Sequence, residues 1–185
     1  MTVSEIRVAF VCTGNRFRSP IAAALLERET PDLPVRIASL GTLDLGRELA
    51  LPEAVAIADS MGLDIVGHRA RSVTKADLER YHLVLGFERK HVMSSVVDAD
   101  ALIEHTFTLP ELVELLAGLP DTPRAGNPVQ QAVARIRRAH ANRPPDFRDS
   151  FPEVPDPLGM TVSAQRETAR ELEALVGKLA ALLFR

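Results

Sequence analysis

A cysteine and an arginine with five residues between them, Cys12 and Arg18, bound the part of the sequence with the clearest potential for chemistry. A loop of this length between a strand and a helix can turn its backbone N–H groups inward. The positive end of the helix dipole then favours a tetrahedral dianion such as phosphate. The same field stabilises a cysteine thiolate, which makes Cys12 a candidate nucleophile. Arg18 can hold two phosphoryl oxygens through its planar fork of donors, so the spacing indicates phosphoryl transfer.

The residues on either side of this loop are typical of a strand and a helix that would position it. Residues 6–12 are mostly apolar and β-branched, as expected for a strand buried on both faces. Ser19 and Pro20 are favoured at the N-cap and first position of a helix, and strong helix formers follow as far as Glu29. We therefore expect a strand, a phosphate-binding loop and a helix in succession, with Gly14 easing the tight curl.

The rest of the chain alternates between strand-like and helix-like segments. Further strands are predicted at residues 35–39, 82–87 and 101–106. Helices are predicted at residues 51–61, 74–80, 88–97, 109–117, 129–141 and 161–184, the seven-residue one capped by Thr74. This alternation favours an α/β fold in which helices cover both faces of a parallel sheet. We expect one domain over residues 1–185, with the proline-rich stretch 118–155 as an excursion within it.

Composition narrows the classes of protein that the chain can belong to. It has 185 residues, 46% hydrophobic and 25% charged, and a net charge of −3. These values argue against disorder and against a nucleic-acid partner. No apolar run approaches the roughly 20 residues of a membrane-spanning helix, and residues 1–11 lack a signal peptide's pattern, so we expect a cytoplasmic protein without membrane insertion. The single cysteine excludes an internal disulfide, and no metal or cofactor is predicted.

Four stretches of the sequence together resemble one known family. Residues 11–20, VCTGNRFRSP, resemble the signature V-C-x-G-N-x-C-R-S-P of the low-molecular-weight protein tyrosine phosphatases, with Phe17 where the family usually has a second cysteine. The stretches SLGT at 39–42, GLD to HRAR at 62–71 and VPDP at 154–157 resemble later motifs of the family, in the same order. The resemblance implies a three-layer α/β/α fold with a four-stranded parallel sheet and the phosphate-binding loop after the first strand.

The resemblance also implies a role for each catalytic residue. Cys12 would be the nucleophile, Arg18 the phosphate clamp, and Asp156 the general acid and then the general base, without a metal. Asp156 lies between two prolines that stiffen the backbone and suit a carboxylate presented from a loop. The loop residues expected to bind the substrate phosphate are Thr13, Gly14, Asn15, Arg16, Phe17 and Ser19. Ser19 would also hydrogen-bond the Cys12 sulfur.

A set of polar residues outside the reaction would support the loop, again by the resemblance. Asn15, in a left-handed conformation, would join Ser39 and His68 in a network that holds the loop in its strained shape. Phe17 in place of the second cysteine leaves Cys12 without an internal thiol to resolve its oxidation.

The substrate walls and the loop rim depart from the family. Leu43, Leu45 and Leu158 stand where tyrosine-specific members usually carry aromatic residues, so the stacking of an aryl ring, about 0.5 to 1.5 kcal/mol, would be lost. Arg16 at the rim of the loop would disfavour cationic phosphoarginine.

The predicted function is metal-independent phosphomonoester hydrolysis through a cysteinyl-phosphate. The substrate would be a phosphorylated protein or a small phosphomonoester, and phosphotyrosine in proteins is the favoured class. Two alternatives remain open. One is a single-cysteine arsenate reductase that uses a small-molecule thiol, and the other is a phosphate-dependent binding module with little turnover. The sequence leaves the oligomeric state open.

Overall fold

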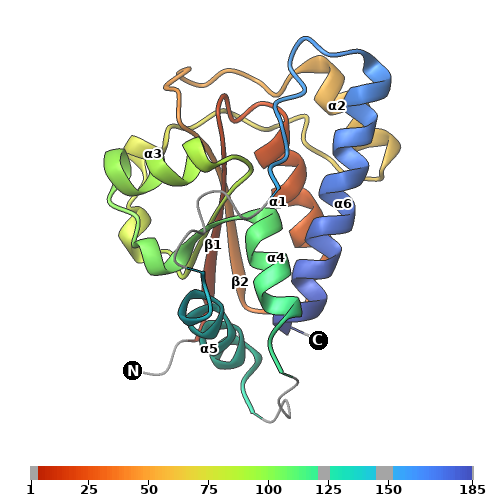
Figure 1. The fold of residues 1–185 in the computed structure, drawn as a ribbon. Coiled ribbons are helices and arrows are strands. Elements are labelled where there is room, and N and C mark those ends of the chain that lie inside the picture. Colours follow the sequence, from red (N-terminus) through yellow and green to blue (C-terminus); the bar gives the residue numbers. More distant parts are fainter. Residues whose placement is uncertain (1–3, 121–125, 145–151, 185) are drawn as a thin grey trace.

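The structure is a computed structural model, and it describes residues 4–120, 126–144 and 152–184. Four strands form one parallel sheet in the order β2-β1-β3-β4, and helices flank both of its faces (Figure 1). The strands are β1 (Ile6–Cys12), β2 (Val35–Gly41), β3 (Leu83–Gly86) and β4 (Thr106–Thr108). The predicted three-layer α/β fold with a four-stranded parallel sheet is confirmed.

The described residues form six α-helices, which flank the sheet. They are α1 (Arg18–Glu29), α2 (Pro52–Ser60), α3 (Arg89–Ala99), α4 (Leu109–Ala117), α5 (Pro128–Ala141) and α6 (Val162–Phe184). Helices α1, α2, α4 and α5 all contact the long α6, whereas α3 lies on the opposite side of the sheet (Figure 1). None of the helices in the described ranges is long and apolar enough to cross a membrane.

Side chains of β1 alternate between two hydrophobic clusters, one on each face of the sheet. Val8, Phe10 and Cys12 belong to the large cluster beneath α1 and α6, while Ala9 and Val11 belong to a smaller one on the α3 side. This alternation follows from the two-residue period of a strand. It places the Cys12 side chain on the α1 side at the carboxyl end of β1.

The order of the strands creates a crevice at that end of the sheet. From β1 the chain crosses to β2 in one direction, and β3 pairs with β1 on the other side. Open α/β sheets bind ligands at such a reversal, outside the carboxyl ends of the two strands. Residues that follow β1 and β3 therefore meet at one site.

Local predictions at three places along the chain are wrong. Ser19 is not the N-cap of α1: the helix begins at Arg18, its N-cap is Phe17, and the Ser19 hydroxyl makes other contacts described below. The helix predicted at 74–80 is two 3-10 turns, Val73–Lys75 and Leu78–Arg80, and Ser72 rather than Thr74 caps the first.

The interruption at 74–80 has a packing cause. Val73 and Leu78 both enter the smaller cluster, and residues five apart do not share a face of an α-helix. The fourth strand lies at Thr106–Thr108 rather than 101–106, because a 3-10 turn, Ile103–His105, precedes it.

Candidate active site

The Cys12 sulfur lies at the carboxyl end of β1, where it is 3% exposed and faces the start of α1. Its Sγ is 3.0 Å from the Ser19 Oγ and accepts a hydrogen bond from the Asn15 backbone N–H at 3.2 Å. Ser19 Oγ also accepts from Asn15 Nδ2 at 2.8 Å and lies 3.2 Å from the Leu40 carbonyl oxygen. The sulfur therefore has one backbone N–H donor, from Asn15, and one hydroxyl, that of Ser19, within hydrogen-bond distance.

The loop between β1 and α1 is held in shape around Asn15, which adopts the expected left-handed conformation with φ of 53°. His68 Nε2 donates to the Asn15 carbonyl at 2.7 Å, and the Arg71 backbone N–H donates to Asn15 Oδ1 at 2.9 Å. Gly41 packs directly against the loop, because a Cβ there would lie 2.9 Å from the Thr13 carbonyl oxygen. Burial and the nearby Arg71 and Arg69 charges lower the pKa of His68, although its bond to Asn15 opposes this shift.

Ser39, which we expected in the same network, lies in β2 beside the loop. Within the described ranges its hydroxyl makes no hydrogen bond to the loop. Its carbonyl oxygen accepts a long bond of 3.5 Å from Arg71 Nη2. The hydrogen bond that β2 makes near the loop comes instead from the next residue, because the Leu40 carbonyl oxygen accepts from the Ser19 hydroxyl.

Arg18 is almost completely buried, with 1% of its surface exposed, and it is held from several directions. Its Nη1 donates to Glu88 Oε1 at 3.1 Å and to the Val154 carbonyl oxygen at 2.9 Å. Its Nη2 donates to Asp156 Oδ2 at 2.6 Å. The guanidinium also lies 5.8 Å from the centre of the Phe87 ring. The structure thus brings the predicted clamp and the predicted acid into direct contact.

Thr13 is positioned by a buried histidine from α3. His91 Nδ1 accepts from the backbone N–H groups of Phe87 and Glu88, so its Nε2 carries the proton and donates to Thr13 Oγ1 at 3.0 Å. Burial, reinforced by the charges of Arg18 and Lys90, lowers the pKa of His91 to about 3. A neutral His91 leaves the Thr13 hydroxyl proton available to a ligand in the loop.

A cavity of about 130 Å³ opens above the Cys12 sulfur. Residues of the loop, Asp156 and four leucines line it. Its lining residues are Cys12, Thr13, Gly14, Arg16, Phe17, Arg18, Leu43, Leu45, Leu51, Asp156 and Leu158. The volume and chemistry suit a phosphate group with an apolar substituent.

Two of the loop residues are held by parts of the protein outside the loop. The Phe17 side chain is buried in the large hydrophobic cluster. Arg16 lies at the rim, where its Nε donates to the Leu49 carbonyl oxygen at 2.7 Å and its Nη2 lies 3.7 Å from Glu48 Oε2. The Arg16 guanidinium is therefore fixed at the cavity mouth rather than free in solvent.

Sequence reasoning missed Glu88 and His91, which orient Arg18 and Thr13. Both residues directly follow the strand predicted at 82–87, and the carboxyl ends of adjacent parallel strands meet at one edge. Once that strand is placed beside β1, the polar residues that follow it are expected at the phosphate-binding loop.

The chain belongs to the low molecular weight phosphotyrosine protein phosphatase family, whose model matches residues 7–121. The matched range contains the whole loop and Glu88 and His91, and it ends before Asp156.

Curated relatives of similar sequence carry the name of the same family. The chain is 39% identical to the low molecular weight protein-tyrosine-phosphatase Wzb of Escherichia coli K12 over 85 residues. The aligned segment covers 46% of this chain and 56% of Wzb. The chain thus spans about half the length of the curated relatives it matches.

Solved structures match over nearly the full length. The low molecular weight protein tyrosine phosphatase from T. tengcongensis is 29% identical, with a TM-score of 0.69 over 95% of this chain and 97% of its own. The YwlE arginine phosphatase from Geobacillus stearothermophilus is 26% identical, with a TM-score of 0.68 over 95% and 91%.

Proposed function

We propose that this protein hydrolyses phosphomonoesters through a cysteinyl-phosphate intermediate, with phosphotyrosine in proteins as the favoured substrate. The observation that carries the proposal is the convergence of Cys12, Arg18 and Asp156 on one cavity, with Arg18 Nη2 and Asp156 Oδ2 2.6 Å apart. The family and the name of the relative Wzb support the same substrate class. A phosphorylated protein is then the expected partner, and the cytoplasm, where a lone catalytic thiol stays reduced, is the expected compartment.

In the first step the Cys12 thiolate attacks phosphorus as the bond to the leaving oxygen breaks. Arg18 Nη1 is occupied by Glu88 and Val154, so the edge formed by Nε and Nη2 would hold two phosphoryl oxygens. Asp156 would pass its proton to the leaving oxygen, which becomes a phenol. Loop N–H groups and the Thr13 hydroxyl would stabilise the charge that develops on the phosphoryl oxygens.

In the second step water attacks the phosphocysteine. Asp156 would take a proton from that water, the sulfur–phosphorus bond would break, and inorganic phosphate would form. The Ser19 hydroxyl, 3.0 Å from Cys12 Sγ, can donate to the departing thiolate. Asn15 N–H already donates to the same sulfur.

The apolar walls bear on the substrate class. Leu43, Leu45, Leu51 and Leu158 line the cavity mouth, and an aryl ring can bury its faces on them. Without aromatic stacking the preference for phosphotyrosine over other aryl phosphates is expected to be modest.

Hydrolysis of para-nitrophenyl phosphate and of a phosphotyrosine peptide, measured across pH in the presence of chelator, tests the proposal. We expect Cys12→Ser to abolish turnover and Asp156→Ala to lower kcat by roughly 10²- to 10⁴-fold on the peptide, whose leaving group needs a proton. Asp59→Ala, at an exposed position in α2, is the matched control and should leave both rates unchanged.

Two outcomes would contradict the proposal. A folded wild type with no phosphatase activity, but with thiol-dependent reduction of arsenate, would indicate an arsenate reductase. Binding of a phosphopeptide without any turnover would indicate a binding module.

A further inference from the structure

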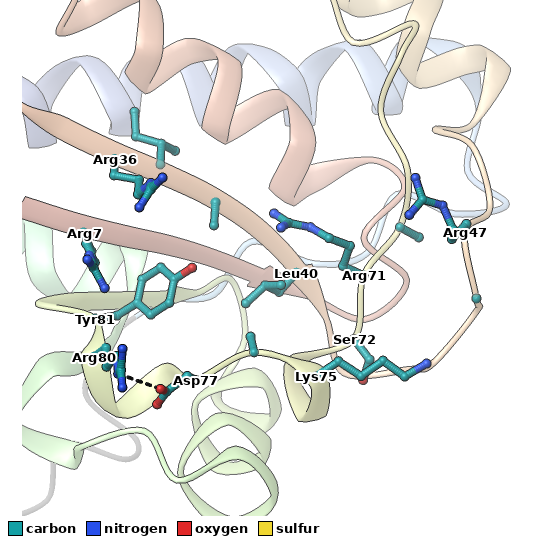
Figure 2. Close-up of a pocket in the computed structure, with 15 residues that line it drawn as sticks. Arg7, Arg36, Leu40, Arg47, Arg71, Ser72, Lys75, Asp77, Arg80 and Tyr81 are labelled. Carbon is teal, nitrogen blue, oxygen red and sulfur yellow. Dashed lines mark ion pairs between the residues drawn. The ribbon is translucent and has the colours of Figure 1, made fainter.

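The sheet face on the α3 side is only partly covered. The smaller hydrophobic cluster packs α3 and the 3-10 turns against β1, β3 and Leu40 at the end of β2. Over β2, the edge strand, the same face is open and forms a cavity of about 740 Å³ (Figure 2). Ala38 and Leu40 of β2 line it, and so do residues of the 42–49 loop and the stretch 70–81. We refer to this cavity as the β2 groove.

Cations dominate the lining of the β2 groove. They are Arg7, Arg36, Arg47, Arg71, Lys75 and Arg80, and among the described lining residues Asp77 is the one carboxylate. The described lining residues therefore carry a formal charge of +5, and with the two carboxylates that pair with Arg7 and Lys75 from outside the lining the region is still positive, in a chain whose net charge is −3. A concentration of one sign of charge in a concave surface raises the local concentration of oppositely charged ligands.

Several of these cations are only weakly neutralised by the protein. Lys75 pairs with Asp44 at 2.6 Å, Arg80 with Asp77 at 2.7 Å and Arg7 with Glu5 at 3.5 Å, all at solvent-accessible positions. Arg36 and Arg47 are exposed, and within the described residues neither forms an ion pair or a side-chain hydrogen bond. Arg36 and Arg47 are thus available to a ligand.

The positions of the cations indicate the shape of that ligand. Figure 2 shows Arg7, Arg36 and Arg80 around the ring of Tyr81 at one end, and Arg71 and Arg47 at the other. At about 3.3 Å per residue along a strand, Arg36 and Leu40 of β2 alone are roughly 13 Å apart. A compact anion cannot contact both ends, whereas an extended polyanionic chain can.

The β2 groove adjoins the catalytic cavity. Leu43 and Leu45 line the catalytic cavity, while Gly46 and Arg47, next along the same loop, line the β2 groove. Arg71 lines the groove with its side chain and holds Asn15 of the phosphate-binding loop through its backbone N–H. A peptide that leaves the catalytic cavity across the 43–47 loop therefore enters the groove.

We propose that the β2 groove binds an acidic segment of the phosphoprotein substrate, a few residues from the phosphorylated side chain. This inference rests on the proposed phosphatase function and adds a substrate determinant to it. Aspartate and glutamate side chains would meet the arginines, and the small apolar side chains of Ala38, Ala70 and Ala76 leave room for the peptide backbone. Electrostatic complementarity of this kind raises the association rate and falls with ionic strength.

Binding to the Cys12→Ser variant tests the proposal without turnover. Fluorescence anisotropy would compare two labelled phosphotyrosine peptides of equal length, one with four flanking Asp or Glu residues and one with Asn or Gln in their place. We expect the acidic peptide to bind at least tenfold more tightly at low salt, and the difference to shrink as salt is raised. Equal affinities of the two peptides would overturn the proposal.

Charge reversal locates the interaction. Arg36→Glu combined with Arg47→Glu should remove most of the preference for the acidic peptide. Arg170→Glu combined with Lys178→Glu, two exposed cations of α6 on the other side of the sheet, should retain it. An equal loss in both double variants would show that net charge rather than the groove is responsible, and would reject the assignment.

Two further measurements separate this proposal from the phosphatase proposal. In the wild-type background Arg36→Glu with Arg47→Glu should leave kcat/KM for para-nitrophenyl phosphate unchanged, since neither residue lines the catalytic cavity. An unphosphorylated acidic peptide should bind the groove even if the chain proves to have no phosphatase activity. Tighter binding of a ten-nucleotide oligothymidylate that displaces the acidic peptide would indicate a nucleic-acid ligand and overturn the proposal.

Discussion

Arg18 and Glu88 form a buried ion pair, with 3.1 Å between Nη1 and Oε1 and side chains that are only 1% and 10% exposed. Lys90 Nζ lies 2.6 Å from the second oxygen of Glu88, which compensates the carboxylate from the solvent side. Because Glu88 caps α3 and follows β3, the pair ties the orientation of Arg18 to the neighbouring strand. The guanidinium therefore has its orientation before any phosphate arrives.

Glu88→Ala should be damaging in both stability and catalysis. Removing one partner of a buried ion pair leaves an uncompensated charge and lowers the free energy of unfolding by about 3 to 5 kcal/mol. Because Arg18 also contacts Asp156, we expect a loss at the lower end of this range. Glu88→Gln keeps an acceptor for Nη1 and should cost less stability, while kcat/KM for para-nitrophenyl phosphate falls by about tenfold or more as Arg18 shifts. Urea unfolding and steady-state kinetics of the two variants check this, and wild-type kcat/KM in Glu88→Ala would contradict it.

His91 should make the protein acid-sensitive. Its pKa is about 3 in the folded chain and near 6.5 in the unfolded chain, so between these values the unfolded chain binds more protons. The free energy of unfolding then falls as pH drops below about 6.5, by up to about 1.4 kcal/mol per pH unit from this residue. His68, whose pKa is also lowered, acts in the same direction.

The His91 contribution can be isolated with His91→Asn, which keeps an acceptor for the N-terminus of α3 but does not titrate. The difference between wild type and this variant in urea unfolding at pH 7 and pH 5 should narrow as pH falls. A difference that is the same at both pH values would show that His91 is not the titrating group. Because Asn is too short to contact Thr13, kcat should also fall, and His91→Gln, which has the reach, should recover part of it.

Gly41→Ala should distort the phosphate-binding loop. The new Cβ would lie 2.9 Å from the Thr13 carbonyl oxygen and 3.0 Å from the Asn15 backbone nitrogen, so backbone must move. Overpacking of this kind costs about 1 to 3 kcal/mol, and we expect kcat to fall at least tenfold. Gly177→Ala in α6, where a Cβ meets nothing, is the matched control: it should keep full activity and gain roughly 1 kcal/mol in stability. Equal activity of the two variants would show that the loop tolerates the displacement.

Arg16→Thr should change the choice between phosphotyrosine and phosphoarginine. The Arg16 guanidinium is fixed at the cavity mouth by Leu49 and Glu48, where a phosphoarginine side chain would enter. Relief of a like-charge contact of about 1 kcal/mol should raise phosphoarginine turnover about fivefold relative to phosphotyrosine. An unchanged ratio of the two kcat/KM values would remove Arg16 from the account of specificity.

Local sequence patterns predict some elements to the residue. The strand Ile6–Cys12 and the helix Leu109–Ala117 agree with expectation at both ends, because each has a clear hydrophobic pattern and the second has a capping box at Thr108. Ser19 departs from the local pattern because of its contacts. A serine before a proline is a good N-cap, but its hydroxyl is used by Cys12, Asn15 and Leu40 instead.

Features that depend on strand order could not be predicted from local patterns. Glu88 and His91 contact the loop only because β3 lies beside β1, and local sequence does not determine that adjacency. The β2 groove exists because one helix and short turns cover the α3 face, which leaves the edge strand open. The cations of the groove come from segments far apart in the chain, between Arg7 and Arg80.

Val154 connects three parts of the site through its main chain. Its N–H donates to the Phe87 carbonyl oxygen at 2.8 Å, and its carbonyl oxygen accepts from Arg18 at 2.9 Å. Every residue type has a main-chain carbonyl group, and every type except proline has a main-chain N–H group. Substitution of Val154 by alanine would therefore leave both hydrogen bonds in place, although they set the position of Asp156 two residues later. The chain between α4 and Val154 includes α5, which packs into the large hydrophobic cluster, and the segment that follows α5 has to dock in this register for Asp156 to meet Arg18. The family match ends at residue 121, and beyond it this main-chain docking brings Asp156 to Arg18.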